Sequence, residues 1–354
     1  MRLHVIALPH TQLTQDYSSC AFTSLTRGFI DMMTDEGHEV IAYAAGEEYE
    51  HHGAEHVTCS AAHGTPEEAQ FERWDASAPH WQVMATNAVR EVHKRREPGD
   101  LICLSSGEWY PFFEPFKNDG LLTEFIAGYQ GVRDTHRVYP SYAWLHTVEG
   151  HWQTAYAADG RDFDTVIPHW YDAASLQGPV SRNAGYYLYL GRLTDRKGYR
   201  IAQQVCERLG VPLVLAGPLD GSGPFRGYGE HLGPVGPDER RHLLQGAAAL
   251  LAPTRYIEPF GLVSIEAQAC GIPVISSDNG GFTETVENGV TGYRCRSFAD
   301  YLDAAVKAPA LDRWNIWRRS DRWHPETIAP QYTRYFEKLQ TLWEDGWYTV
   351  PPGV

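Results

Sequence analysis

Short apolar runs alternate along the chain with segments in which apolar residues recur every three or four positions. Runs of the first kind are typical of buried strands, and segments of the second kind of amphipathic helices. Regular alternation of the two favours an α/β fold with parallel sheets. In the first half the pattern predicts helices over residues 19–36 and 81–94, and strands over residues 3–8, 40–44, 101–105, 137–146 and 165–168.

Two stretches interrupt this rhythm. Residues 47–81 are rich in His, Glu, Ala and Pro, and we expect them to form an irregular or partly helical surface insertion. Residues 171–185 are small, polar and contain Gly and Pro, which is typical of a linker between domains. A chain of 354 residues suits two domains of ordinary size.

The second half repeats the strand–helix rhythm. An amphipathic pattern near the end predicts a further helix over residues 329–343. The strands predicted before it cover residues 186–190, 213–216, 248–253 and 273–277, and the helices cover residues 198–209, 237–246 and 262–270.

The predicted helix over residues 262–270 lies between two informative carboxylates. Glu258 precedes the helix, and Glu266 lies about 40° from Leu262 on a helical wheel, inside the apolar arc. A carboxylate on a buried face needs partners, because burying an unpaired charge is costly. A helix N-terminus also favours anions. Phosphates held by the helix end, and hydroxyls held by the carboxylates, would suit a sugar nucleotide.

This stretch belongs to a series of motifs between about residues 186 and 296. The motifs are Y-L-G-R-L-T-D-R-K-G at 189–198, L-V-L-A-G at 213–217, E-x7-E from Glu258 to Glu266, P-V-I at 273–275, G-G-F-T-E-T-V at 280–286 and N-G-V-T-G at 288–292. In the order and spacing of these motifs the chain resembles the retaining family 4 glycosyltransferases, whose fold is GT-B, an α/β architecture of two Rossmann-like domains facing each other across a cleft.

The resemblance implies an acceptor-side domain over residues 1–172 and a nucleotide-sugar domain over residues 173–325. A terminal helix over residues 326–345 would pack back on the first domain. It also implies transfer of a sugar from a nucleoside-diphosphate donor to a hydroxyl acceptor, with retention of anomeric configuration and without a metal ion or other cofactor. The acceptor, the sugar and the base stay open.

Donor contacts follow residue by residue from the same resemblance. Arg192 and Lys197 would neutralise the leaving diphosphate, with Gly217 nearby. Backbone N–H groups of Phe260, Gly261 and Leu262 would point at the donor. The alternative for the two cations is a solvated basic turn.

The two carboxylates take different roles in this interpretation. Glu258 would accept hydrogen bonds from sugar hydroxyls beside the reacting carbon, and its charge would favour a cation-like transition state. Glu266 would hold the ribose hydroxyls. The structural alternatives are a capping carboxylate for Glu258 and an ion pair for Glu266.

The first half resembles the family only in patches. His146, placed by the pattern at the end of a strand, resembles a histidine that faces the donor sugar, although a buried histidine bound to backbone is the alternative. The segment V-I-P-H-W-Y-D at 166–172 resembles V-I-P-N-G-x-D, with His169 and Trp170 in place of Asn-Gly.

Two polar loops are candidates for recognising the acceptor. The first follows the first strand and offers Thr11, Gln12 and Tyr17. The second follows residues 101–105 and offers Ser106 and Glu108. In each case an ordinary capped surface loop is an equally good interpretation.

Charge and composition narrow the partners. The net charge of −15 argues against a non-specific binder of nucleic acid or membrane surfaces. No apolar run is long enough to span a membrane. Six scattered cysteines favour reduced core thiols in a cytoplasmic protein. Asp162-Phe163-Asp164 is a short D-x-D that we interpret as turn chemistry rather than a metal site.

Two alternatives stay open. One is a non-catalytic GT-B-like subunit that binds a nucleotide sugar or a partner. The other is a glycosyltransferase acting on modified DNA, since residues 8–11 and 37–41 resemble enzymes found in phage and environmental sequences. The acidic balance disfavours this second alternative.

Overall fold

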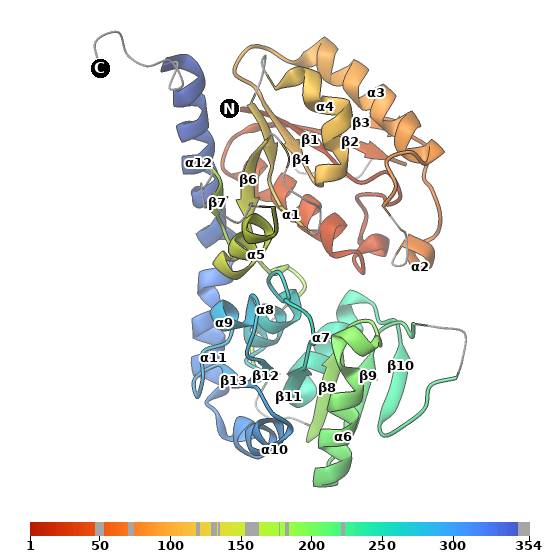
Figure 1. The fold of residues 1–354 in the computed structure, drawn as a ribbon, viewed down its shortest axis with the longest axis vertical. Coiled ribbons are helices and arrows are strands. Elements are labelled where there is room, and N and C mark those ends of the chain that lie inside the picture. The colour runs from red at the N-terminus through yellow and green to blue at the C-terminus, as the bar shows by residue number, and fades with distance from the viewer. Residues whose placement is uncertain are drawn as a thin grey trace. The chain divides into compact units, whose positions relative to one another are not determined.

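The chain folds into two compact units, seen in a computed structural model (Figure 1). The first comprises Met1–Pro140, Leu145–Ile167 and the residues from 328 onward, and the second comprises Ser141–Trp144 and Pro168–Thr327. The structure describes residues 1–46, 53–69, 74–117, 121–128, 133, 135–152, 163–176, 178–180, 184–220 and 224–345.

The first unit contains a parallel sheet with the strand order β3-β2-β1-β4-β5-β6-β7. Its central strands are buried and mostly apolar, so they need cover on both faces. They are β1 (Arg2–Ile6), β2 (Glu39–Ala45), β3 (Glu55–Ser60), β4 (Leu101–Leu104), β5 (Leu121–Glu124), β6 (His136–Tyr139) and β7 (Thr165–Val166). The helices of this unit are α1 (Ala21–Asp35), α2 (Pro66–Ala69), α3 (Pro79–Arg95), α4 (Tyr110–Phe113) and the greater part of α5 (Tyr142–Trp152).

The second unit repeats this topology with the order β10-β9-β8-β11-β12-β13. The strands are β8 (Tyr186–Leu190), β9 (Leu213–Ala216), β10 (Glu230–Gly233), β11 (Ala247–Ala252), β12 (Val274–Ser277) and β13 (Gly292–Cys295). The helices are α6 (Tyr199–Leu209), α7 (Pro237–Gly246), α8 (Leu262–Ala269), α9 (Phe282–Thr285), α10 (Phe298–Lys307) and α11 (Arg313–Arg319). The second sheet thus follows the order 3-2-1-4-5-6 of a doubly wound nucleotide-binding sheet, and the first sheet follows the same order with a seventh strand added after the sixth.

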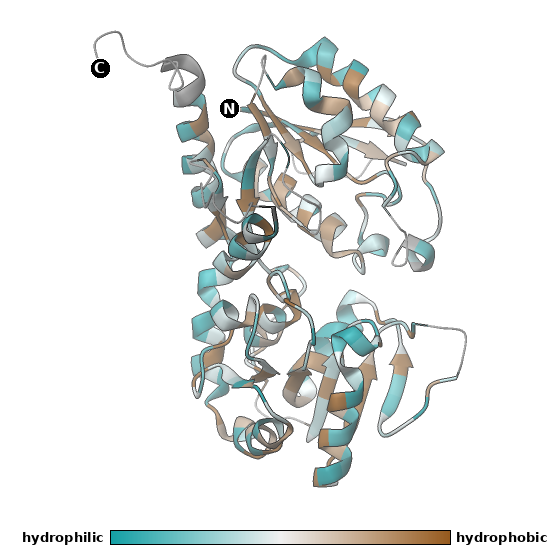
Figure 2. Cartoon of the chain, viewed as in Figure 1, coloured by the Kyte–Doolittle hydropathy of each residue, from teal (hydrophilic) through white to brown (hydrophobic). Residues whose placement is uncertain are grey.

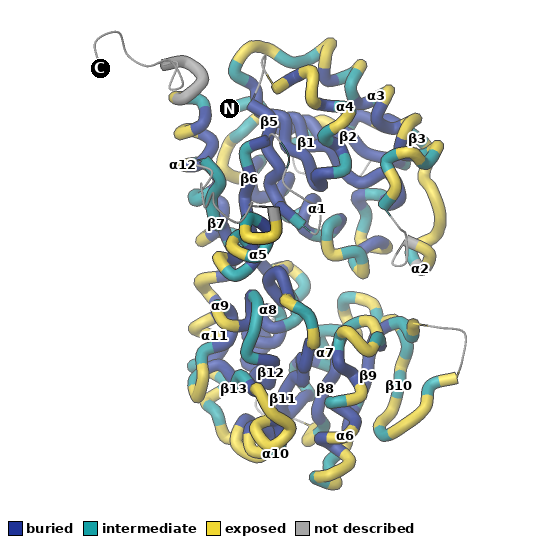
Figure 3. Tube along the Cα trace, viewed as in Figure 1, coloured by how far each residue is buried: buried dark blue, intermediate teal, exposed yellow. Residues whose placement is uncertain are grey.

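Apolar side chains fill the space between each sheet and its helices. The central strands of both sheets are almost wholly buried, whereas the edge strands β3, β7 and β10 are partly or wholly outside the core (Figure 3). Helices such as α6 carry apolar and polar residues together, as expected of an element with one face on the core (Figure 2). Two clusters of buried side chains make up the core of the second unit.

The last helix, α12 (Pro325–Asp345), joins the core of the first unit through residues beyond 328. The Phe29 ring stacks on Phe125 at 4.1 Å and meets the edges of Tyr332 and Phe336 at 5.2 and 6.1 Å. The Tyr332 hydroxyl donates to the Phe125 carbonyl at 2.8 Å. The end of the chain therefore completes a core that its beginning starts.

The strand predicted over residues 137–146 is wrong in its second half. Strand β6 ends at Tyr139, and helix α5 begins at Tyr142. Pro140 cannot donate to a ladder, and the Ser141 hydroxyl accepts from the Trp144 N–H at 3.0 Å, as a helix cap does. The apolar run that follows has no clear period, so the hydrophobic pattern does not distinguish strand from helix there. The cap at Ser141 makes it a helix.

The insertion predicted over residues 47–81 is more regular than expected where the structure describes it. It supplies edge strand β3, in which buried Val57 and Cys59 alternate with Thr58 and Ser60, and the short helix α2. Helix α3, which follows, is the helix predicted over residues 81–94. Strand β3 escaped the sequence analysis because its apolar positions are few and polar residues fill the others.

The α12 contact yields a stability prediction. Phe336→Ala should lower the free energy of unfolding of the first unit by about 3–5 kcal/mol, because it removes a fully buried ring and leaves a cavity. The neighbouring exposed Glu337→Ala serves as control and should change stability by less than about 0.5 kcal/mol. Chemical denaturation measures both, and equal stability of the two variants would show that α12 is not part of this core.

Candidate active site

The candidate site of the second unit lies at the carboxyl ends of β8 and β11. The strand order reverses between these neighbours, and ligands of doubly wound sheets bind beyond such a switch point. Residues 191–198 follow β8, and residues 253–261 follow β11 and lead into α8. Most donor residues predicted from the sequence lie on these two segments.

Backbone contacts fix the segment after β8. The Thr194 hydroxyl accepts from the Lys197 N–H at 3.1 Å and caps a short turn. Gly198 closes it with φ of 77°, and a Cβ there would lie 2.0 Å from the Pro253 carbonyl oxygen. The Arg255 N–H donates to the Arg196 carbonyl at 2.8 Å. Only glycine fits at 198, so the two segments lie against each other.

This contact brings Lys197 to Glu258. The Lys197 Nζ lies 2.7 Å from Glu258 Oε2, and the Tyr256 hydroxyl donates to the same oxygen at 2.9 Å. The Glu258 side chain is 8% exposed and that of Lys197 is 27% exposed. A carboxylate buried to this degree needs such donors. The capping carboxylate given as the structural alternative for Glu258 is not what the structure shows, since its side chain forms an ion pair beyond the end of β11. Its role toward a donor sugar stays a prediction.

Arg192 lies on the same segment and is exposed. Its carbonyl accepts from the Tyr189 hydroxyl at 2.8 Å. Burial, assisted by the charge of Glu258, raises the pKa of Tyr189, so the phenol keeps its proton as a donor. No carboxylate in the described part of the chain pairs with Arg192, which leaves its guanidinium available to an anion.

The glycine pair at 280–281 packs directly on the Glu258 segment. The Gly281 N–H donates to the Glu258 carbonyl at 2.7 Å. A Cβ on Gly280 would lie 2.5 Å from that carbonyl oxygen, and one on Gly281 would lie 2.5 Å from the Cα of Phe260. The separate G-G-x-x-E motif therefore holds the backbone of the E-x7-E motif.

Packing against Phe260 accounts for His169, which stands where the resembling segment V-I-P-N-G-x-D has Asn. The buried Phe260 ring meets the edge of His169 at 5.2 Å and of Trp323 at 5.5 Å. His169 and Trp170 are both buried. Burial lowers the pKa of His169 to about 3, so the imidazole is neutral at physiological pH. The two residues in place of Asn-Gly thus supply packing behind the segment that enters α8.

Glu266 forms the ion pair anticipated as its structural alternative. Its Oε1 lies 2.8 Å from Nη1 of Arg240 on α7, and its side chain is 14% exposed. The carboxylate keeps some access to solvent. Pairing with Arg240 and binding a ribose are therefore compatible, and the ribose role stays a prediction.

Gly217 lies at the end of β9, beside the Arg192 segment. A Cβ there would lie 2.1 Å from the Gly191 carbonyl oxygen. The Gly217 carbonyl also accepts from Nε2 of His231 on β10 at 2.8 Å. His231 was missed by the sequence analysis, because nothing in its local pattern distinguishes it from the other 15 of the 16 histidines.

His146 lies on helix α5 rather than at a strand end, in the part of α5 that belongs to the first unit. The start of α5 is anchored in the second unit. The Ser141 hydroxyl donates to the Pro259 carbonyl at 2.6 Å, and the N–H groups of Tyr142 and Ala143 donate to Glu284 at 3.1 and 2.8 Å. The role of His146 toward a donor sugar stays a prediction.

The acceptor-side candidates of the first unit have mixed outcomes. The Thr11 hydroxyl is buried and accepts from Thr23 at 2.7 Å, and the Ser106 hydroxyl accepts from the Glu108 N–H at 3.1 Å. Both contacts are structural. Gln12 and Tyr17 are joined by a long hydrogen bond of 3.4 Å.

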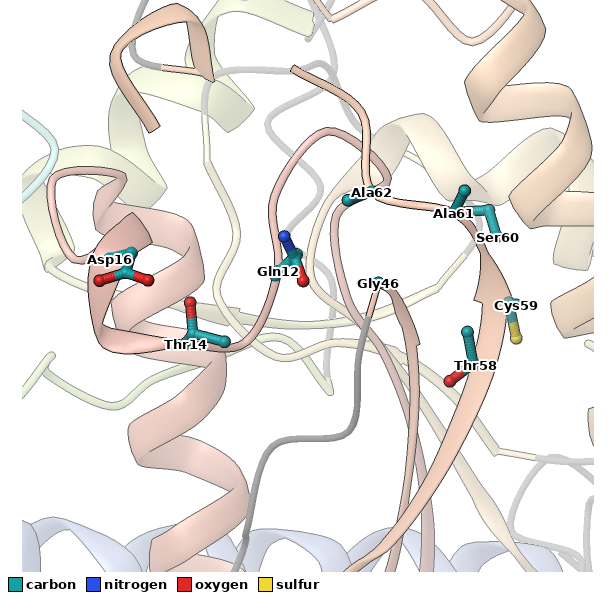
Figure 4. A pocket seen from close by; sticks show the side chains of 9 residues that line it. All are labelled: Gln12, Thr14, Asp16, Gly46, Thr58, Cys59, Ser60, Ala61 and Ala62. Atoms are coloured by element: carbon teal, nitrogen blue, oxygen red, sulfur yellow. The ribbon is translucent and has the colours of Figure 1, made fainter. Parts of the chain in front are cut away.

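Gln12 also lines an open pocket of about 780 Å³ (Figure 4). Its walls come from the loop after β1 (Gln12, Thr14, Asp16), from Gly46 after β2, and from residues 58–62 at the end of β3. The volume is within the usual range for a small-molecule site.

A buried carboxylate, Glu124 at the end of β5, also escaped the sequence analysis. Burial raises its pKa, and Arg137, with Nε 3.6 Å from Oε2, opposes this shift. Its strand was not predicted, so no pattern marked the residue.

The D-x-D is described only in part, since Asp162 lies outside the described residues. Asp164 accepts from the Arg137 N–H at 3.0 Å, a structural contact. The described residues contain no group of three or more His, Cys, Asp or Glu side chains arranged to hold a metal ion.

All six cysteines are free thiols. No described helix is both long and apolar enough to cross a membrane.

Solved structures match this architecture over nearly the whole chain. Sucrose-phosphate synthase from Thermosynechococcus elongatus aligns with a TM-score of 0.68 and 18% identity over 96% of this chain and 99% of that one. AviGT4, a glycosyltransferase of avilamycin A biosynthesis, aligns with a TM-score of 0.66 and 19% identity over 96% and 98%. The chain has the GT-B fold. HepE of Anabaena, solved with UDP-glucose, aligns with a TM-score of 0.66 and 16% identity over 97% and 100%.

Sequence comparison points to the second unit. Residues 177–311 match the family described as glycosyl transferases group 1. D-inositol 3-phosphate glycosyltransferase of Mycolicibacterium smegmatis is 32% identical over 147 residues, 38% of this chain and 34% of the relative. That of Mycobacterium tuberculosis H37Ra is 31% identical over 193 residues, 49% and 40% of the two chains. The matches thus span two fifths or less of these curated relatives.

The neutral His169 yields a pH prediction. Its pKa is about 3 when folded and near 6.5 when unfolded, so between these values the unfolded chain binds a proton that the folded chain does not. Stability should therefore fall as the pH falls through this window, by at most about 1.4 kcal/mol per pH unit from this group. His169→Asn should flatten the acid side of a stability–pH curve. An unchanged slope would show that His169 does not stay neutral in the fold.

Proposed function

We propose that this protein transfers a sugar from a nucleoside-diphosphate sugar to a hydroxyl acceptor, with retention of anomeric configuration. One observation carries the proposal: the segments that follow β8 and β11 bring Lys197 onto Glu258 and also carry exposed Arg192, within the residues that match group 1 glycosyl transferases. HepE, which shares the fold, is solved with UDP and with UDP-glucose, and this supports a nucleotide-sugar donor.

The cations would bind the donor diphosphate. Arg192 offers a planar fork for two phosphate oxygens, and Lys197 a compact charge. Lys197 would then contact both the diphosphate and Glu258 Oε2, so that the carboxylate stays paired. The other oxygen of Glu258 would accept a hydrogen bond from a sugar hydroxyl. The first turn of α8 leaves backbone N–H groups without intrahelical partners, and these would face the same anion.

In the proposed reaction the bond between the anomeric carbon and the diphosphate oxygen breaks, and the leaving diphosphate takes the electron pair. The acceptor oxygen bonds to the anomeric carbon on the same face, and its proton passes to the leaving phosphate oxygen. The two cations stabilise the negative charge that develops on the diphosphate, and Glu258 stabilises the positive charge on the sugar. No side-chain nucleophile takes part.

The first experiment identifies the donor. Thermal-shift measurements with UDP-, GDP- and ADP-glucose should show stabilisation by one nucleotide, because a ligand that binds only the folded state raises its melting temperature. Release of the nucleoside diphosphate should follow, with and without EDTA. Binding without any turnover would instead favour a non-catalytic nucleotide-sugar subunit.

Glu258→Gln keeps the shape of the side chain and removes its charge. We expect turnover to fall by roughly 100-fold or more, because the charge acts chiefly in the transition state, while donor affinity changes by less than about threefold. Glu287→Gln is the matched control, since Glu287 forms an exposed ion pair with Arg319 on another part of the unit. Full turnover in a folded Glu258→Gln protein would remove Glu258 from the mechanism.

Glu266→Gln separates a ribose contact from a structural ion pair. If the carboxylate holds the ribose, donor affinity should fall by about tenfold or more. Arg240→Met breaks the same ion pair but keeps the carboxylate, so it should lower stability while affecting donor affinity less. Calorimetric titration with the nucleoside diphosphate compares the two. Equal loss of affinity in both variants would reduce Glu266 to a partner of Arg240.

A further inference from the structure

The pocket of the first unit contains side chains that the resemblance did not assign. Thr14, Asp16, Thr58 and Ser60 line it beside Gln12 (Figure 4). It lies at the ends of β1, β2 and β3, which form one edge of the parallel sheet. In doubly wound sheets ligands bind outside the carboxyl ends of the strands, and β1 is one of the two strands at the switch point of this sheet.

The wall from β3 follows the alternation of an edge strand. Val57 and Cys59 are buried in the core, so Thr58 and Ser60 face the opposite side. Burial raises the pKa of the Cys59 thiol to about 12, which leaves it inert rather than nucleophilic. Thr58 is exposed, so its hydroxyl is the group of this strand that a ligand can reach, whereas the Ser60 Oγ atom is buried beneath the pocket surface.

The wall after β1 is held in place by its neighbours. The Gln12 side chain lies directly over Gly46, where an added Cβ would come within 2.2 Å of Oε1. The Gly46 N–H donates to the Ser60 carbonyl at 2.9 Å, which joins the ends of β2 and β3. The Tyr17 hydroxyl donates to the Gly64 carbonyl at 3.1 Å and stands beside Gln12. The positions of the polar groups thus depend on backbone contacts rather than on a ligand.

The charge of the lining selects among ligands. Asp16 is the charged residue among the nine that line the pocket, and none of these nine is Lys, Arg or His. Amide, hydroxyl and carboxylate groups bind sugar or polyol hydroxyls. A phosphate needs Arg, Lys or a row of N–H donors, and here it would meet a carboxylate within a chain of net charge −15.

We propose that this pocket binds an acceptor that is a sugar or polyol without a phosphate group. The inference rests on the proposed transferase function, and it separates this chain from the curated relatives, whose names contain D-inositol 3-phosphate. The negative charge of Asp16 disfavours the binding of anions in this pocket.

The test offers acceptors in matched pairs. One pair is myo-inositol with D-myo-inositol 3-phosphate, and another is glucose with glucose 6-phosphate. Acceptor binding is measured by ligand-observed NMR, and transfer is measured with the donor found above. We expect the unphosphorylated member of at least one pair to bind and the phosphorylated member to bind more weakly.

Asp16→Lys reverses the charge of the exposed side chain that the inference relies on. It should shift the ratio of affinities within a pair toward the phosphorylated member by roughly fivefold, the effect expected of one exposed charge pair. Raised salt should reduce this shift. Asp35→Lys is the matched control, because Asp35 is exposed at the end of α1 and does not line the pocket. It should leave the ratio unchanged.

The outcomes separate the two proposals. Donor binding and donor hydrolysis are measured without any acceptor, so their loss contradicts the transferase function itself. If the donor binds but the phosphorylated member of each pair is preferred, or if no member binds, the acceptor inference is overturned and the donor site stands. An equal shift in Asp16→Lys and Asp35→Lys would also overturn it, since the discrimination would then come from net charge rather than from the pocket.

Discussion

The ion pair between Lys197 and Glu258 exists because two strand ends are held together by their backbones. Each residue follows a different strand, and 61 positions separate them in the chain. Gly198 lets the first segment approach the Pro253 carbonyl, and Gly280 lets a third segment lie on the backbone of Glu258. A side chain at either glycine would push the segments apart, and hydrogen bonds between them would become too long to form.

The same constraint gives the site its electrostatic character. The Glu258 carboxylate beyond the end of β11 is nearly buried, and Lys197 and Tyr256 supply the donors that a buried carboxylate needs. Arg192 remains exposed on the neighbouring segment. The site therefore combines a carboxylate, Glu258, that is held by two donors with an exposed cation, Arg192, that can bind an anion. Such an arrangement suits a transition state in which positive and negative charge develop on different groups.

The two units use one topology for different chemistry. Both sheets run in the same strand order, and in both the polar groups lie at the carboxyl edge. The second unit places cations there, whereas the pocket of the first unit is lined by neutral groups and one carboxylate. An anionic donor and a neutral acceptor are consistent with this division of charge, and neither follows from the fold itself.

The sequence by itself determined the α/β class and most strands of the second unit, because buried parallel strands appear as continuous apolar runs. It also marked Lys197 and Glu258, through motifs with fixed spacing. Only the tertiary structure decided that these two residues form a pair, and that Glu266 pairs with Arg240. Such contacts join distant segments, and no local pattern records them.

Local competition explains the remaining errors. The cap at Ser141 turned an apolar run into helix α5, and edge strand β3 carried too few apolar residues to be recognised. The pocket beside β3 therefore could not be found from the sequence, since its walls come from three strand ends that only the sheet brings together. Periodicity reports which face of an element is buried, while the partners of that face are set by packing.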